Sequence, residues 1–213
     1  MRSHNTPGPG RRSRLVWVLA SAAGAAGWLA LVAAAPPRFF AVAVPFCLAW
    51  AVLSAAAAPA DAPRFAPLDV AIGIGSGVVL FAASRAFLFV ACGPWSRALC
   101  GPLGAMYGRF ETRDALAALA LGFVLAPAEE LFWRGVVQAR LASRFGAVRG
   151  VAVATLAAAA ASLATGEALL ALAMLPTYGL WGALFAWRRD LTAPVASHAT
   201  WSVLVATLFP PGF

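Results

Sequence analysis

The chain contains seven long apolar segments, and these constrain its fold more than any other feature. A helix needs roughly 20 consecutive apolar residues to cross the hydrocarbon core of a bilayer. Only 11% of the 213 residues are charged, whereas an average globular protein has about 25%. The sequence therefore predicts an integral membrane protein, an all-α polytopic transmembrane helix bundle of about seven spans. The segments are residues 15–35, 39–58, 68–92, 115–142, 147–165, 168–187 and 191–209.

The arginines predict the orientation of the bundle. Every basic residue is an arginine, and the cytoplasmic loops of membrane proteins carry an excess of basic residues. With a cytoplasmic N-terminus, ten arginines fall on the inner side and only four, Arg38, Arg97, Arg109 and Arg113, on the outer side. We therefore expect the N-terminus in the cytoplasm, and a location in a bacterial plasma membrane.

The net charge of +8 would suggest a nucleic-acid partner if the protein were soluble. Here the arginines stand at the ends of apolar segments, where anionic lipid headgroups attract them. The expected partner is therefore the lipid bilayer, and no nucleic acid.

No connector is long enough to hold a packed soluble domain, so the chain is expected to form one membrane domain. We expect a disordered basic N-terminal tail at 1–14 and N-terminal transmembrane helices at 15–92. Residues 93–114 mix large apolar side chains with arginines, as an interfacial helix or a re-entrant connector does. A core of further transmembrane helices follows at 115–209.

Three local features concern how the helices pack. The stretch "GIGSG", Gly73 to Gly77, lies within an apolar segment, which favours close helix packing over phosphate binding. Pro127 is expected to interrupt the helix in which it lies, because it lacks a backbone donor. Cys92 and Cys100 flank the connector and could pair, or could be separate buried thiols.

Two adjacent carboxylates stand inside the fourth apolar segment, in "APAEELFWRG". An ionisable group within a span costs roughly 2.5–3.5 kcal/mol on insertion scales and usually marks function or a paired site. Glu130 and Arg134 are four residues apart and share a helix face, so they can pair. Glu129 is rotated from that face by about 100° and can point into a cavity as a general base. The alternative is that both glutamates serve packing, paired with Arg134 and Arg85.

A second polar pair lies in the last segment, in "PVASHATWSVL". His198 and Ser202 are also four residues apart on one helix face. A neutral imidazole can bind a metal or donate to an oxyanion, and Ser202 can add a hydroxyl donor. Alternatively, His198 is a packing histidine whose hydrogen bonds are satisfied.

These motifs resemble the CPBP family of intramembrane proteases, the CAAX-protease and bacteriocin-processing group also called Abi. "EELFWR" is followed about seventy residues later by "SHATWS", and the resemblance covers roughly residues 115–205. It implies a helical membrane protease, with residues 115–209 as its catalytic core. It also implies that Glu129 activates water, that Glu130 holds Arg134, and that His198 belongs to the catalytic cluster. Ser202 takes the place of the family's terminal Asn or Asp.

The chain departs from the family pattern at the middle motif, Phe-x-x-x-His. Ala158 and Ser162 stand at the corresponding positions, and the other histidine, His4, lies in the N-terminal tail. Family members are often described as metalloproteases, which would make Glu129 and His198 candidate metal ligands. A zinc site usually needs three protein ligands, so the set for Zn²⁺ is incomplete. In a metal-free route, Ser162 and Ser202 would join His198 in stabilising the tetrahedral intermediate.

Three functions are consistent with these residues. The first is an intramembrane endopeptidase that hydrolyses a peptide bond of a membrane-associated protein or peptide with glutamate-activated water. The second is a pseudoprotease that binds a membrane partner without cutting it, as the replacement of the middle histidine by Ser162 would allow. The third is a small proton-coupled transporter that uses Glu129 and His198 as a relay.

Overall fold

The computed structural model describes residues 11–34, 37–58, 66–92, 97–108, 112 and 114–208, and these residues form helices without strands. The helices on the N-terminal side of the glutamate pair are α1 (Arg11–Ala34), α2 (Phe39–Ala57), α3 (Pro67–Ala91), α4 (Arg97–Gly108), α5 (Ala115–Ala120) and η1 (Leu121–Leu125). The remaining helices are α6 (Ala126–Glu130), η2 (Leu131–Gln138), α7 (Ala139–Phe145), α8 (Ala147–Ser162), η3 (Leu163–Thr165), α9 (Ala168–Arg188), α10 (Thr192–Val203) and η4 (Leu204–Leu208).

The structure confirms the predicted all-α bundle. Six of the described helical segments are long and apolar enough to cross a membrane. The predicted seventh span is also helical, but α10 and η4 have only 12 and 5 residues. Most of the predicted disordered tail, residues 1–10, lies outside the described residues, and α1 already begins at Arg11. Within the predicted connector, the structure describes the short helix α4 and residues 112 and 114.

The glutamate-bearing helix continues through Pro127, contrary to the predicted interruption. It runs over Ala115–Phe145 and contains two π-helical stretches, η1 and η2. A proline in a helix clashes with the carbonyl four residues earlier, here that of Phe123 in η1. The wider π turn makes room for the ring, and such turns occur frequently at functional sites.

Helix α3 packs very closely on α10, and its glycines make this possible. A Cβ at Gly73 would lie 2.5 Å from the Cβ of Ala196, and one at Gly77 would lie 2.6 Å from the carbonyl oxygen of Ser197. The Ser76 hydroxyl lies 3.0 Å from the Ser197 hydroxyl across the same contact. The predicted close-packing role of "GIGSG" is therefore confirmed, and α3 holds the helix that carries His198.

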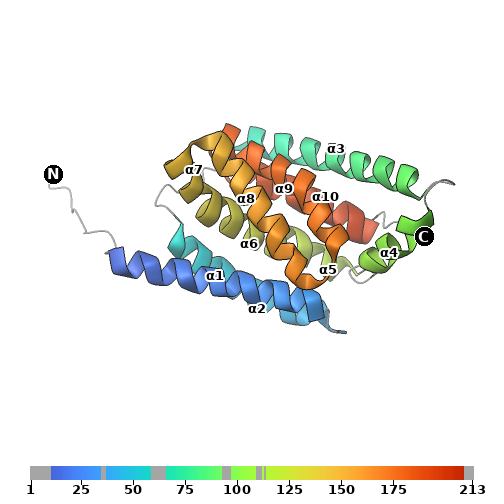
Figure 1. The fold of residues 1–213 in the computed structure, drawn as a ribbon, viewed down its shortest axis with the longest axis horizontal. Helices are drawn as coiled ribbons and strands as arrows, with labels where there is room; N and C mark the ends of the chain where they lie inside the picture. The colour runs from blue at the N-terminus through green and yellow to red at the C-terminus, as the bar shows by residue number, and fades with distance from the viewer. Residues whose placement is uncertain are drawn as a thin grey trace.

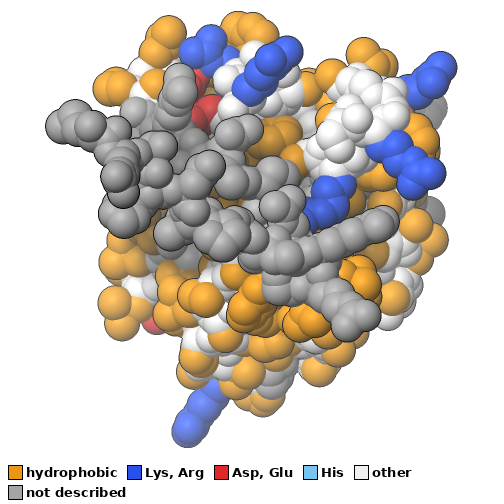
Figure 2. All heavy atoms as spheres, turned by 90° about the vertical axis from the view of Figure 1, so that its left-hand side faces the viewer, with side chains coloured by type: hydrophobic (Ala, Val, Ile, Leu, Met, Phe, Trp, Pro, Cys, Tyr) orange, Lys and Arg blue, Asp and Glu red, His pale blue; other side chains and the backbone are white. Residues whose placement is uncertain are grey.

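The two ends of the bundle, which lie at the left and right of Figure 1, differ in composition. At the end where α7 leads into α8, Arg140 donates to the carbonyl of Ala57 and Arg188 pairs with Asp69. Figure 2 looks onto this end, where arginine side chains stand around the described surface. We call it the arginine end.

At the opposite end, Cys92 and Cys100 form a disulfide, so of the two alternatives for these cysteines the paired one is correct. The disulfide joins the end of α3 to α4. Leu103 of α4 is buried against Leu88 and Ala91, next to Leu169 and Leu170 at the start of α9. We call this the disulfide end.

The α3–α10 contact gives a first prediction. Gly77→Leu should lower the midpoint of thermal unfolding in detergent, because its side chain must displace the backbone of α10. Overpacking of this kind costs about 1–3 kcal/mol. The matched control is Gly75→Leu on the exposed side of the same helix, where no atom outside the helix lies within 4 Å. Equal midpoints for the two variants would contradict the proposed contact.

Candidate active site

A buried cluster of charged and aromatic side chains lies in the middle of the bundle. Glu130 is 0% exposed, and its Oε1 accepts hydrogen bonds from Arg134 Nη1 at 3.1 Å and His198 Nδ1 at 2.9 Å. Arg134 also donates from Nη2 to the carbonyl oxygen of Tyr178 at 2.9 Å. The predicted pairing of Glu130 with Arg134 is present. Because the carboxylate and the guanidinium neutralise each other, the cluster is tolerable in an apolar bundle.

The imidazole of His198 is held from two sides. Its Nδ1 faces Glu130, and the ring stacks on Trp181 with centroids 3.8 Å apart and planes inclined by 15°. Trp181 is itself anchored by a hydrogen bond from Nε1 to the Ser197 hydroxyl, at 3.2 Å. A histidine whose one ring nitrogen is fixed by a carboxylate presents the other in a defined direction. His198 therefore has Nε2 left for a substrate or a water.

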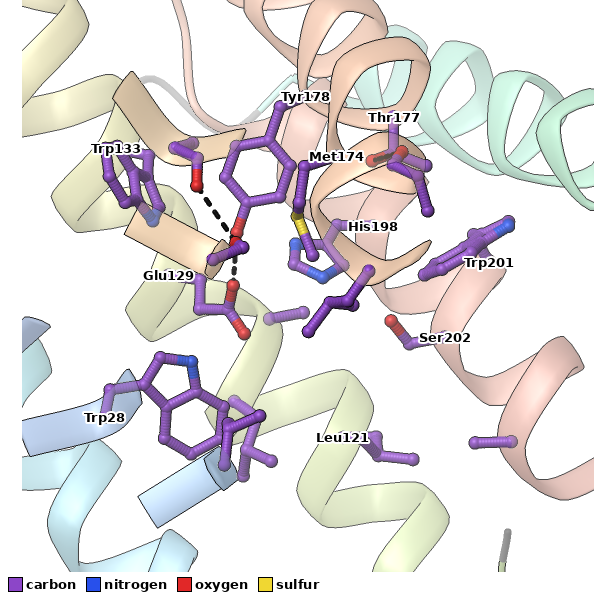
Figure 3. Close-up of a pocket in the computed structure, with 18 of the residues that line it drawn as sticks. Trp28, Leu121, Glu129, Trp133, Met174, Thr177, Tyr178, His198, Trp201 and Ser202 are labelled. Atoms are coloured by element: carbon purple, nitrogen blue, oxygen red, sulfur yellow. Dashed lines mark hydrogen bonds between the residues drawn. The ribbon is translucent and has the colours of Figure 1, made fainter. Parts of the chain in front are cut away.

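Glu129 points in a different direction from Glu130, as its rotation on the helix predicted, and takes no part in the ion pair with Arg134. The phenol of Tyr178 donates a hydrogen bond to Glu129 Oε2, and Figure 3 shows the two side chains meeting beside His198. The guanidinium of Arg134 lies over the Tyr178 ring, with Cζ 4.4 Å from the centroid. Tyr178 therefore links the cavity-lining carboxylate of Glu129 to the buried ion pair.

A cavity of about 210 Å³ brings the polar groups together. Glu129, His198, Ser162 and Ser202 all line it, while Glu130 and Arg134 lie behind its wall. The remaining lining is mostly aromatic and aliphatic, and comes from Trp28, Leu29, Val32, Phe39, Phe40, Leu121, Leu125, Ala126, Trp133, Ala158, Thr165, Leu170, Ala173, Met174, Thr177, Tyr178, Trp181, Trp201, Val205 and Ala206.

The two predicted serines differ in their hydrogen bonding. The hydroxyl of Ser162 donates to the carbonyl of Ala158 at 2.9 Å, one turn back in its own helix. Its proton is therefore directed into the helix. The Ser202 side chain is half-buried in the cavity wall, one turn after His198. Of the two, Ser202 is the better placed to donate to a group in the cavity.

Sequence reasoning missed Tyr178 and Trp181. Tyr178 is one of two tyrosines in the chain, and a phenol within an apolar segment needs a hydrogen-bond partner. That requirement was the available signal for Tyr178, whereas nothing distinguished Trp181 from the chain's other tryptophans. Arg85, considered as a partner for a glutamate, is exposed on α3. The partners of the two glutamates in the structure are Arg134, His198 and Tyr178.

The donor set does not fit a zinc ion. Zinc sites usually have three protein ligands drawn from His, Cys, Asp and Glu. The described residues include no group of three such side chains arranged to hold a metal. Glu129 and His198 are the two that line the cavity, and Glu130 is fully buried with its Oε1 engaged by Arg134 and His198.

A comparison with known protein families gives one match. Residues 111–204 match the family model described as Rce1-like, type II CAAX prenyl endopeptidase. This part of the chain is similar to the Rce1-like family. The match confirms the resemblance to CAAX proteases and covers Glu129, Glu130, Arg134 and His198. No curated protein and no solved structure matches the chain.

The buried ion pair of this Rce1-like segment gives a second prediction. Arg134→Leu should lower the stability in detergent by about 3–5 kcal/mol, because it leaves the Glu130 charge buried without its partner. Arg149→Leu is the matched control, since Arg149 is exposed at the arginine end, and surface substitutions change stability by about 0.5 kcal/mol or less. Thermal unfolding followed by tryptophan fluorescence measures both, and an unchanged midpoint for Arg134→Leu would rule out the buried pair.

The incomplete donor set gives a third prediction. Ser162→His would add an imidazole to the wall that already contains Glu129 and His198, so Zn²⁺ should raise the unfolding temperature of this variant. Leu163→His is the control, because Leu163 is 57% exposed and is not part of the cavity. The natural chain and the control should show no zinc-dependent shift. A shift of equal size in the natural chain would show that the ligand set is already sufficient.

Proposed function

We propose that the protein is an intramembrane endopeptidase that hydrolyses a peptide bond of a membrane-associated protein or peptide. The observation that carries the proposal is one cavity lined by Glu129 and His198, with His198 fixed by Glu130. A carboxylate can activate water as a general base, and an oriented imidazole beside it can stabilise an oxyanion. The match of residues 111–204 to the Rce1-like family model supports the same reaction class.

In the first step, Glu129 accepts a proton from a water molecule in the cavity. The water oxygen then forms a bond to the carbonyl carbon of the scissile peptide, and the carbonyl π electrons move to oxygen. Tyr178, which donates to Glu129 Oε2, orients the carboxylate so that the other oxygen faces the water. General-base assistance of this type contributes about 10²–10⁴ in rate.

The tetrahedral oxyanion is then stabilised by donors already in place. In this proposal His198 is protonated and donates from Nδ1 to Glu130 and from Nε2 to the oxyanion. Ser202 supplies a second donor from one turn along α10. When the C–N bond breaks, Glu129 returns its proton to the departing amine, so that the products are a new carboxylate and a new amino terminus.

A binding function without cleavage is the second candidate. It is favoured by Ser162, which stands where the family has its middle histidine and whose hydroxyl is engaged by Ala158. In that case the cavity would hold an apolar segment of a partner, and Glu129 would serve only to orient Tyr178.

The fourth prediction separates these two candidates. New protein termini would be mapped in membranes from cells that express the natural chain, Glu129→Gln or Ser202→Ala. Glu129→Gln should abolish the termini, because an amide cannot accept the proton. Ser202→Ala should slow their appearance by about 10²–10³, the usual cost of one oxyanion donor.

The control is Ser143→Ala, at an exposed position of α7 outside the cavity, which should leave every terminus unchanged. Termini that persist undiminished in Glu129→Gln would contradict the proposed base. If the natural chain produces no termini beyond those of cells that lack it, the proposed cleavage is wrong and the binding function is the better description.

A further inference from the structure

The cavity occupies one half of the bundle. Its deepest lining residues, Tyr178 and His198, lie near the middle of the bundle beside Glu129, and Glu129 stands about halfway along the Ala115–Phe145 helix. From there the lining continues to Phe39 at the start of α2 and Leu170 near the start of α9. Both positions belong to the disulfide end.

The arginine end, by contrast, takes no part in the cavity. Arg140, Arg144, Arg149, Arg188 and Arg189 all lie toward that end, and none of them lines the cavity. Between the cavity and this end, the space is filled by buried polar contacts such as the hydrogen bond from Gln138 Nε2 to the carbonyl of Gly182, at 2.8 Å. The cavity therefore extends from Glu129 toward the disulfide end and not toward the arginine end.

Two independent features point to which end is cytoplasmic. Arginine-rich ends of membrane helices lie on the cytoplasmic side, where anionic lipids and the positive-inside bias favour them. Disulfides persist in oxidising compartments and are rare in the cytoplasm, and Cys92–Cys100 lies at the other end. Charge and redox chemistry therefore assign the same orientation.

We propose that the active-site cavity is loaded from the extracytoplasmic side. Its substrate is then an apolar segment of a membrane-anchored polypeptide whose scissile bond lies in the outer half of the bilayer. This inference deepens the proposed function and rests on it for the identity of the reaction, whereas the direction of access rests on the position of the cavity, the arginines and the disulfide.

The lining also specifies the chemistry of the substrate. Aromatic and aliphatic side chains make up most of the wall, and the cavity-lining residues of the described chain include no lysine or arginine. An acidic peptide or a free C-terminal carboxylate would meet the Glu129 carboxylate, while the protonated His198 of the proposed mechanism is already bonded to Glu130. The cavity therefore favours internal peptide bonds flanked by apolar residues.

The test of access uses cysteine labelling, which needs no enzymatic activity. In a Cys47→Ala background, since Cys47 is the free thiol of the described cysteines, single cysteines would be introduced as Ala164→Cys, Leu170→Cys and Ser143→Cys. Ala164 is exposed at the disulfide end, Leu170 lines the cavity and Ser143 is exposed at the arginine end. The probe is a membrane-impermeant maleimide, applied to intact cells and to opened membranes.

The proposal expects Ala164→Cys and Leu170→Cys to react in intact cells, and Ser143→Cys to react only after the membranes are opened. The reverse pattern overturns it, because the cavity would then face the cytoplasm. If Ala164→Cys reacts in intact cells and Leu170→Cys does not, the proposal is also overturned, because the cavity is then closed to the outer side.

A second readout keeps this inference separate from the proposed function. Termini that depend on Glu129 should map to extracytoplasmic or outer-leaflet positions of membrane-anchored proteins, flanked by apolar residues. Glu129-dependent termini in cytoplasmic segments would overturn the inference while the endopeptidase proposal stands. If labelling follows the expected pattern and no such termini appear, the endopeptidase proposal has failed and the direction of access is retained.

Discussion

The buried contact among Glu130, Arg134 and His198 is the interaction on which the rest of the site depends. A bilayer offers no solvent to stabilise an isolated carboxylate, so Glu130 can be fully buried only because a guanidinium neutralises it. The same oxygen that accepts from Arg134 also accepts from His198. This one oxygen of Glu130 therefore both pairs with the guanidinium and orients the imidazole.

A shell of tight packing keeps this contact in place. Helix α10 packs directly against the backbone of α3 at Gly73 and Gly77, and the His198 ring stacks on Trp181. Hydrogen bonds donated by Trp181 and by Trp201 connect α10 to its neighbouring helices. Groups that stabilise a transition state must be preorganised, and in the proposed reaction this packing would supply that preorganisation.

The features that could be predicted from the sequence are those set by residues close together in one helix. The pairing of Glu130 with Arg134, and the separate direction of Glu129, followed from helical spacing within one segment. The disulfide was left open because pairing depends on where two helix ends meet. The continuity of the helix through Pro127 was missed because neighbouring turns can widen into π geometry. Tyr178 was missed because its partner, Glu129, is 49 residues away in sequence and is brought close only by packing of α9 on the glutamate helix.

The Cys92–Cys100 disulfide limits how the protein can open. It ties α4 to the end of α3, and Leu103 fixes the same helix against the start of α9, so α4 cannot swing away as a hinged cover. The opposite wall of the cavity is built differently, because α1 and α2 contribute Trp28, Phe39 and Phe40, and neither helix takes part in the disulfide. The α1–α2 side of the cavity is therefore held against the other helices by noncovalent packing, whereas the end of α3 is cross-linked to α4.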